Sequence, residues 1–224
     1  MSANLIPILW ESTLQTLYMV FMSTLLGTII GAPLGIFLAT SRRGELLSAP
    51  VANTVLGLVV NAARSTPFII LVVAIIPFTR LVAGTSIGTT AAIVPLTIAS
   101  APFIARLIET AIREVDAGLI EAARAMGATP GQIVRKVLVP EAMPGIILGL
   151  TLAVVSLIGY SAMVGAVGGE GLGDLGIRYG YQRFMPEVML AVVVILILLV
   201  QLVQSCGEWI ASRFDKRAPR NRGR

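Results

Sequence analysis

The sequence predicts an all-α polytopic membrane protein with about five transmembrane helices in one domain, residues 1–224. The chain is 56% hydrophobic and only 13% charged, whereas soluble domains carry about 25% charged residues. Crossing a bilayer takes roughly 20 apolar residues per helix. Four windows of at least that length contain no charged residue: 12–41, 81–105, 142–169 and 188–207. With a fifth, interrupted stretch, the expected spans are about 14–40, 54–80, 87–108, 145–167 and 187–209.

The second of these spans is interrupted by a charge. Residues 46–63 and 65–79 are uncharged, but Arg64 stands between them. Two separate spans would need a polar turn here, and the tetrapeptide RSTP is a poor one. We therefore expect one span, with its core from about Thr66 to Ile76, extended by a helix at the interface or packed inside protein. Arg64 is then either an interfacial arginine that reaches the headgroups or a buried contact to a partner loop or subunit interface.

The distribution of basic residues predicts the orientation. Cytoplasmic loops of membrane proteins carry an excess of Lys and Arg. With the N-terminus outside and the C-terminus inside, fourteen basic residues are cytoplasmic and three are external. The external three are Arg80, Arg178 and Arg183. The basic tail, residues 211–224, would then hold the last span in place from the cytoplasm, with an anionic-lipid site as the alternative.

Several kinds of chemistry are excluded by residue types that the chain lacks. There is no histidine and one cysteine, Cys206, so the usual zinc and iron sites and a Ser-His-Asp triad cannot be built. Neither lysine, Lys136 or Lys216, follows a glycine, so there is no phosphate-binding loop for ATP. The carboxylates fall at span ends or in loops, unlike the mid-membrane acid of a proton pump. We therefore expect no catalytic residue, metal or cofactor, and we attribute the net charge of +5 to topology rather than to nucleic-acid binding.

A charged loop, about 109–142, separates the third and fourth spans. Asp116 can cap a helix over Ala117–Met126, and Gly127 supplies the left-handed residue that ends it. Thr129 can cap a second helix, with Pro130 at its first position and Gln132 completing a capping box. We expect Pro140 to end that second helix.

The first of these two helices is mildly amphipathic. Its apolar residues fall at helical spacing on one stripe: Leu119, Ile120, Ala123 and Met126. The stripe either folds onto the chain's own spans or forms a knob that docks into a separate protein. A short helix fixed by caps at both ends can transmit force to the membrane spans, which a flexible loop cannot.

The loop resembles the EAA loop of ABC-importer permeases. Glu121, Ala122, Ala123, Gly127 and Pro140 stand at the spacing of its pattern, E-A-A-x3-G-x9-I-x-L-P, with valines at the Ile and Leu positions. Three further segments are similar to the permease subunit of methionine importers: "ARSTPFIILVVAIIPFTRLVAGTSIG", "AAIVPLTIASAPFIAR" and "GYSAMVGAVGGEGLGDLG". The resemblance covers about residues 14 to 210.

The resemblance implies a function and a set of partners. In that family the short helix of the loop inserts into a groove of an ATP-binding subunit, so we assign ATPase coupling to Glu121, Ala122, Ala123, Met126, Gly127 and Pro140. Two permease copies pair with two ATP-binding subunits, and an extracytoplasmic substrate-binding protein docks outside. The expected location is a bacterial inner membrane, in contact with lipid, and the expected cargo is methionine.

A glycine-rich segment follows the fourth span. Residues 159–176 contain seven glycines, each costing a helix about 1 kcal/mol relative to alanine. The glycines indicate either close helix packing or a broken helix that lines a water-filled path. On the second interpretation, the path or its outer gate is formed by Tyr160, Ser161, Met163 and Val164.

Three other functions compete with a methionine permease. An intramembrane enzyme lacks the necessary side chains. An ATP-independent channel would not require the capped loop. A permease of the same architecture for another amino acid or small solute fits the sequence nearly as well, because a neutral zwitterion needs no buried ion partner.

Overall fold

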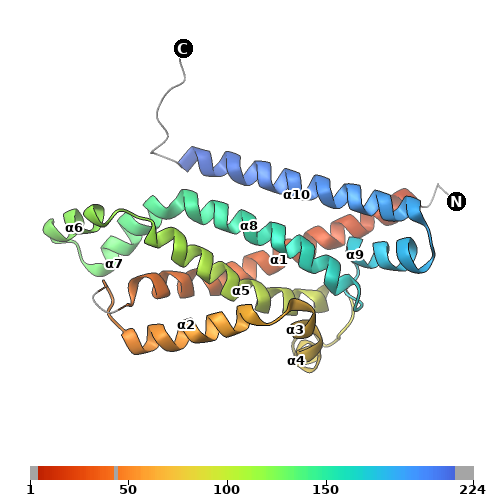
Figure 1. Ribbon diagram of the computed structural model, residues 1–224, viewed down its shortest axis with the longest axis horizontal. Helices are drawn as coiled ribbons and strands as arrows, with labels where there is room; N and C mark the ends of the chain where they lie inside the picture. The colour runs from red at the N-terminus through yellow and green to blue at the C-terminus, as the bar shows by residue number, and fades with distance from the viewer. Residues whose placement is uncertain (1–4, 43–44, 215–224) are drawn as a thin grey trace, which may run out of the picture.

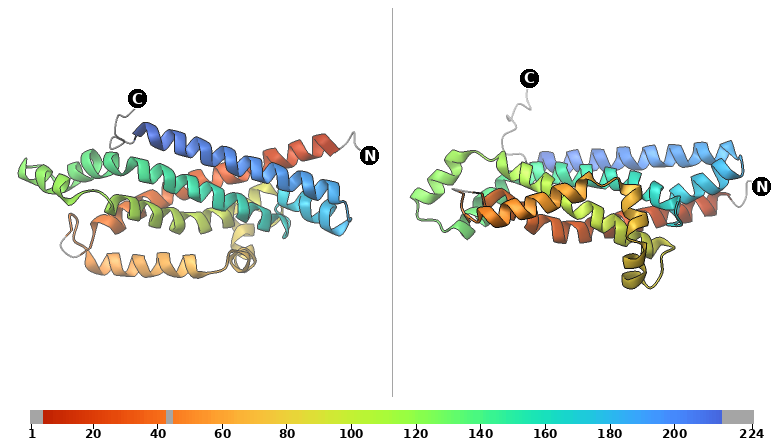
Figure 2. Two further views of the ribbon diagram at one scale, coloured as in Figure 1. Left: turned by 45° about the horizontal axis from the view of Figure 1, so that its top comes forward. Right: turned by 60° about the horizontal axis from the view of Figure 1, so that its bottom comes forward.

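The computed structural model describes residues 5–42 and 45–214, and it forms an elongated helical bundle (Figures 1 and 2). The predicted basic tail falls mostly outside the described residues, because only 211–214 of it belong to the last helix. All regular elements of the described part are helical, which confirms the predicted all-α class.

Four long apolar helices build the bundle. They are α1 (Leu5–Thr40), α5 (Thr89–Arg113), α8 (Val139–Gly165) and α10 (Pro186–Phe214). By length and composition each can cross a membrane, α8 together with the turns that precede it. They overlap four of the five expected spans. Large apolar side chains along the outward side of α10 are exposed, such as Leu190, Leu198 and Leu202, as a lipid-facing helix requires.

Small residues let α1 and α5 approach closely. Gly27, Gly31 and Gly35 recur every fourth residue on α1, so they share one face. A Cβ on Gly31 would lie 2.6 Å from the Ala101 carbonyl oxygen of α5. Without a hydrophobic driving force between helices in lipid, such close packing supplies the association energy. The α1–α5 pair therefore forms the centre of the bundle, as Figure 1 shows.

The expected second span is broken in the structure. Helix α2 (Pro50–Ser65) and helix α3 (Phe68–Ala74) are bent by 99° with respect to each other, and α4 (Ile76–Ala83) follows after a second break. The cause of the first break is Pro67, which disfavours the helical conformation of Thr66. Thr66 accordingly has φ −78° and ψ 124°. Counted as one span, the bent pair brings the number of candidate spans to five.

The remaining elements lie at the two ends of the bundle. Helices α6 (Ala117–Ala125) and α7 (Pro130–Ile133) lie at one end, and a π-helical turn, η2 (Val134–Leu138), joins α7 to α8. At the opposite end, α9 (Gly171–Leu175) and the π-helical η3 (Gly176–Gln182) connect α8 to α10 (Figures 1 and 2).

Candidate functional site

Helix α6 is fixed at both ends by its own sequence. The Asp116 carboxylate accepts a hydrogen bond from the Gly118 N–H at 2.7 Å, which satisfies one free donor of the first turn. At the other end, Gly127 has φ +79°, the left-handed conformation that side chains resist. The Gly127 N–H donates to the Arg124 carbonyl at 2.9 Å. The predicted caps are confirmed, and α6 ends at Ala125 with Met126 as its C-terminal cap.

The second helix of the loop begins as predicted but does not end as predicted. The Thr129 N–H donates to Gln132 Oε1 at 2.9 Å, and Pro130 occupies the first turn. Pro140, however, does not end the helix: 130–165 is continuous through η2 into α8. In the π-helical turn the Val139 N–H bonds to the Val134 carbonyl, five residues back. This change in the backbone hydrogen bonds just before Pro140 accommodates a residue that has no N–H to donate. The expectation of a helix end at Pro140 was therefore wrong.

The apolar stripe of α6 is divided between two environments. Ala123 is 4% exposed and, with Ile120, packs against a core cluster that includes Ile133 and Leu138. Leu119 and Met126 point outward, and Met126 is 81% exposed. The remaining coupling candidates of this segment are also exposed: Glu121, Ala122 and Gly127. One side of the helix thus packs on the chain's own bundle, while its other side is exposed within the described chain.

A buried carboxylate links α1, α2 and α5 at the end of the bundle that carries α6. Glu109 of α5 is 2% exposed and is surrounded by three arginines. Its nearest guanidinium nitrogens belong to Arg106 at 2.5 Å, Arg113 at 2.7 Å and Arg42 at 3.6 Å. Arg106 also donates to Asn61 Oδ1 of α2 at 2.5 Å. We call these five residues the Glu109 cluster; it connects the end of α1, helix α2 and the last turns of α5, directly before α6.

Sequence reasoning missed this cluster, although part of its signal was present. Arg106, Glu109 and Arg113 stand at i, i+3 and i+7, a spacing that puts all three on one helical face. Nothing in the sequence indicates that Arg42 and Asn61 reach the same point. A second contact supports the junction, because Asn53 of α2 donates to the Leu38 carbonyl at 2.8 Å and to Ser41 Oγ at 2.9 Å.

The glycine-rich segment lies at the other end and is tightly packed. A Cβ on Gly165 would overlap the backbone of residues 173–174, and a Cβ on Gly173 would overlap the backbone of Ala162. The Gly171 N–H donates to Gln15 Oε1 at 3.0 Å, and the Leu172 N–H donates to Thr16 Oγ1 at 2.9 Å. Close packing is therefore the principal role of Gly165 and Gly173. Helix α8 ends at Gly165, close to the expected end of the fourth span, and the interpretation of this segment as a broken helix that lines a water-filled path stays a prediction.

The four predicted path residues do not share one environment. Tyr160 lines a cavity, and its ring stacks on Phe68 with centroids 4.4 Å apart. Ser161 is buried and donates to the Ile158 carbonyl at 2.8 Å. Val164 is buried in the core, and Met163 is 47% exposed on the outer surface of the described chain. The structure thus brings Tyr160 to a cavity, and the assignment of all four residues to the path stays a prediction.

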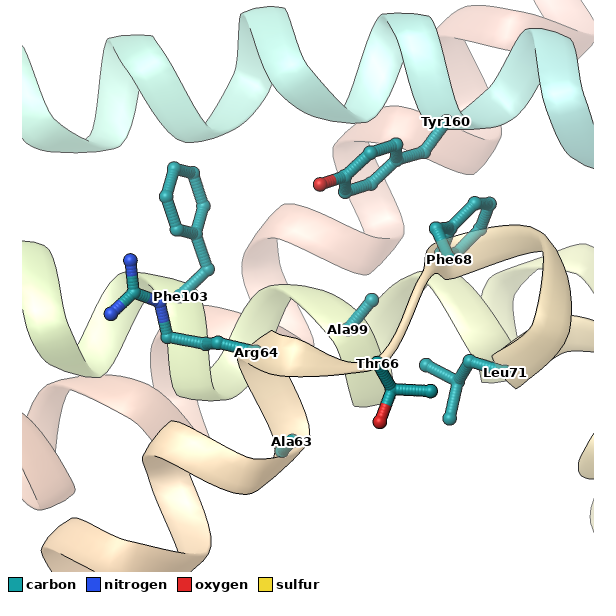
Figure 3. A pocket seen from close by; sticks show the side chains of 8 residues that line it. All are labelled: Ala63, Arg64, Thr66, Phe68, Leu71, Ala99, Phe103 and Tyr160. Carbon is teal, nitrogen blue, oxygen red and sulfur yellow. The ribbon is translucent and has the colours of Figure 1, made fainter.

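The cavity has a volume of about 150 Å³ and lies at the bend between α2 and α3 (Figure 3). Its lining consists of Ala63, Arg64, Thr66, Phe68, Leu71, Ala99, Phe103 and Tyr160. Arg64 places its guanidinium 5.8 Å from the centroid of the Phe103 ring. In Figure 3 the Tyr160 hydroxyl points toward the side of the cavity where Arg64 and Phe103 lie.

Comparison with known proteins identifies the family. Residues 31–218 match the family described as "Binding-protein-dependent transport system inner membrane component". A probable D-methionine transport system permease protein, MetI, of Vibrio cholerae is 54% identical over 210 residues, which are 94% of this chain and 93% of the relative. The protein of the same name from Pasteurella multocida is 51% identical over 215 residues, 94% of this chain and 99% of the relative.

Solved structures agree with this match. A chain of the MetNI methionine ABC transporter, in a study of its inward-facing conformations, superposes with a TM-score of 0.94 at 49% identity. The match covers 96% of this chain and all of that chain. An amino acid ABC transporter at 22% identity shares the fold with a TM-score of 0.77, over 93% of this chain and 94% of its own. The chain therefore belongs to the family of inner-membrane components of binding-protein-dependent transport systems.

Proposed function

We propose that this chain is the permease subunit of an ATP-driven importer of methionine, accepting the L-isomer and the D-isomer. The observation that carries the proposal is the agreement between the family match over 31–218 and relatives about half identical along nearly the whole chain, which are named as D-methionine permeases. The absence of an ATP-binding loop from the sequence fits a chain whose energy comes from a partner.

The proposed assembly contains two copies of this chain, two ATP-binding subunits and an external substrate-binding protein. The end that carries α6 faces the cytoplasm, and the N-terminus lies outside, in agreement with the distribution of basic residues. ATP is bound on the partner subunits, and this chain holds no cofactor or metal. The membrane is the inner membrane of a bacterium.

Helix α6 is the proposed contact with the ATP-binding subunit. Its capped ends make it rigid, and its exposed side presents Glu121, Ala122 and Met126. When two ATP-binding subunits close on ATP, their grooves would carry α6 with them. The buried contacts of Ala123 and the Glu109 cluster would then transmit the displacement to α5, α2 and the end of α1. The spans around Tyr160 and Met163 would reorient in response.

Uptake in whole cells tests this proposal. A bacterial strain that lacks methionine synthesis and its own methionine importer is supplied with this chain, a cognate ATP-binding subunit and a binding protein. We expect ATP-dependent uptake of radiolabelled L-methionine and D-methionine that disappears when the ATP-binding subunit is omitted. Uptake without the ATP-binding subunit would indicate an independent channel. ATP-dependent uptake of another radiolabelled amino acid, with no uptake of methionine, would support the architecture and reject methionine as the substrate.

A further inference from the structure

Arg64 lies about midway along the length of the bundle, and it is exposed within the described chain. Its guanidinium faces Phe103, which is ten residues before the end of α5 and fourteen after its start. At 1.5 Å per residue these offsets correspond to about 15 Å and about 21 Å along the helix. An arginine at a lipid headgroup would lie near an end of the long membrane-crossing helices such as α5. This position does not favour the interfacial interpretation of Arg64.

Arg64 also differs from the paired arginines of the described chain. Arg42, Arg106 and Arg113 share Glu109, and Arg178 pairs with Asp174. Within residues 5–42 and 45–214, no carboxylate lies within salt-bridge distance of Arg64. Its guanidinium lies over the Phe103 ring instead. A guanidinium over an aromatic ring is held less strongly than one that makes two hydrogen bonds to a carboxylate. This is a weak substitute for an anion.

The cavity beside Arg64 is large enough to hold more than one water molecule. Its volume of about 150 Å³ is several times the roughly 30 Å³ that one water occupies in the liquid. Phe68, Phe103 and Tyr160 supply aromatic walls, and Leu71 supplies an aliphatic one. Charged side chains at membrane depth face water-filled cavities and mark the paths of substrates. The 99° bend after Ser65 is what brings Arg64 of α2 and Phe68 of α3 to the same cavity.

We propose that this cavity, which we call the Arg64 cavity, is a transient binding site for the amino acid within the membrane. The Arg64 guanidinium exchanges the Phe103 ring for the substrate carboxylate, a geometry that permits two parallel hydrogen bonds. The aromatic faces then accept the ammonium group, and the apolar side chain lies toward Leu71. The inference rests on the proposed function for the identity of the substrate. It differs from the expectation that a zwitterion needs no ion partner along its path.

Binding measured without the external binding protein tests the inference. The complex of this chain with its ATP-binding subunit is placed in lipid nanodiscs, and saturation-transfer NMR is recorded with L-methionine and with L-methioninol, in which an alcohol replaces the carboxylate. The variants are Arg64→Gln, Arg64→Lys and Arg80→Gln. Arg80 is the matched control, because it is an exposed arginine of the neighbouring helix α4 that bonds to Ser86 and lies outside the cavity.

We expect the unmodified complex to bind L-methionine at least tenfold more tightly than L-methioninol. Arg64→Gln should abolish that preference, Arg64→Lys should weaken methionine binding several-fold because ammonium replaces a planar fork, and Arg80→Gln should change nothing. Equal binding of both compounds, or unchanged methionine binding in both Arg64 variants, would overturn the inference. If the unmodified importer takes up methionine while either result is seen, the proposed function stands and only the cavity's role fails. If binding depends on the carboxylate but the importer does not take up methionine, the binding site stands and methionine is not the transported substrate.

Discussion

The two ends of the bundle are held together by different physical means. At one end, α6 is seated on the bundle by the small side chain of Ala123, next to the Glu109 cluster, and exposes its other side. At the opposite end, the glycine-rich segment contacts α8 backbone to backbone, with no room for a Cβ at Gly165 or Gly173, and its backbone N–H groups donate to side chains of α1. Side-chain contacts between charged groups can rearrange, whereas interlocked backbone cannot without unpacking.

Under the proposed function, this difference predicts that the end that carries α6 moves during transport. A lever needs a rigid body, a free surface and a connection that survives displacement. Helix α6 with its two caps provides the first two, and the Glu109 cluster provides the third. Among the described residues, the glycine-rich end has no comparable capped helix, and we propose that it stays fixed while α6 moves. Variants at the two ends test whether they differ in this way.

The largest effect is expected at Glu109. Glu109→Gln leaves three arginines around a neutral amide, and breaking a buried ion pair in this way costs about 3 kcal/mol or less, because the arginines are partly exposed and screened. We expect a clearly lowered midpoint of thermal unfolding for the detergent-solubilised complex. Glu114→Gln is the control, since Glu114 is an exposed carboxylate just past the end of the same helix. Equal midpoints for the two variants would show that the cluster does not hold this end together.

The next effect concerns the fixed end. Gly173→Ala forces a methyl group into the backbone of Ala162, and such overpacking costs about 1–3 kcal/mol. The matched control is Gly159→Ala on α8, where a Cβ meets nothing within 4 Å and helix propensity improves by up to about 1 kcal/mol. We expect a lower unfolding midpoint for the first variant and an equal or higher one for the second. An unchanged unfolding midpoint for Gly173→Ala would show that this end is packed less tightly than the structure indicates.

A smaller energetic effect with a large functional consequence is expected at Gly127. Gly127→Val places a β-branched residue at φ +79°, which costs about 1–2 kcal/mol and displaces α6. ATP hydrolysis should continue while uptake is lost, as measured together in proteoliposomes. Gly131→Ala, at an exposed helical glycine without positive φ, should leave the ratio of uptake to hydrolysis unchanged. A normal ratio in Gly127→Val would count against a rigid lever.

The smallest effect is expected at the first cap. Asp116→Ala removes the acceptor of the Gly118 N–H and costs about 1 kcal/mol. Because the helix still packs through Ala123, we expect faster hydrogen exchange confined to α6, with the global unfolding midpoint nearly unchanged. Asp116→Asn retains a side-chain oxygen and should exchange as the unmodified protein does. Faster exchange spread over α5 and α8 would contradict the separation between lever and bundle.

Much of this contrast could be predicted from local sequence, and the remainder depends on long-range contacts. Charge-free windows predict the four long helices, and the sequence from Asp116 to Gly127 predicts a capped helix because caps depend on residues a few positions apart. The continuous helix through Pro140 was missed, since the π-helical turn that accommodates it has no sequence signature of its own. The bend at Pro67 was likewise interpreted as one interrupted span.

The candidate sites also depend on long-range contacts that the sequence does not predict. Arg64 was singled out as the charge that interrupts a span, but its place beside Phe103 and Tyr160 follows from the bend and from packing between three helices. Helical spacing puts Ser161 and Val164 on one side and Tyr160 and Met163 on the other. It does not say which side faces the core. The structure puts the first pair inside.

Site-specific photocrosslinking tests the central claim that α6 is where the motor subunit holds this chain. A photoreactive amino acid replaces either Met126, 81% exposed beside α6, or Phe184, 85% exposed at the opposite end. Each variant is expressed with the ATP-binding subunit and irradiated in membranes. The account predicts a covalent adduct with the ATP-binding subunit from position 126 and none from position 184. Capture of that subunit from position 184, with none from position 126, would contradict it.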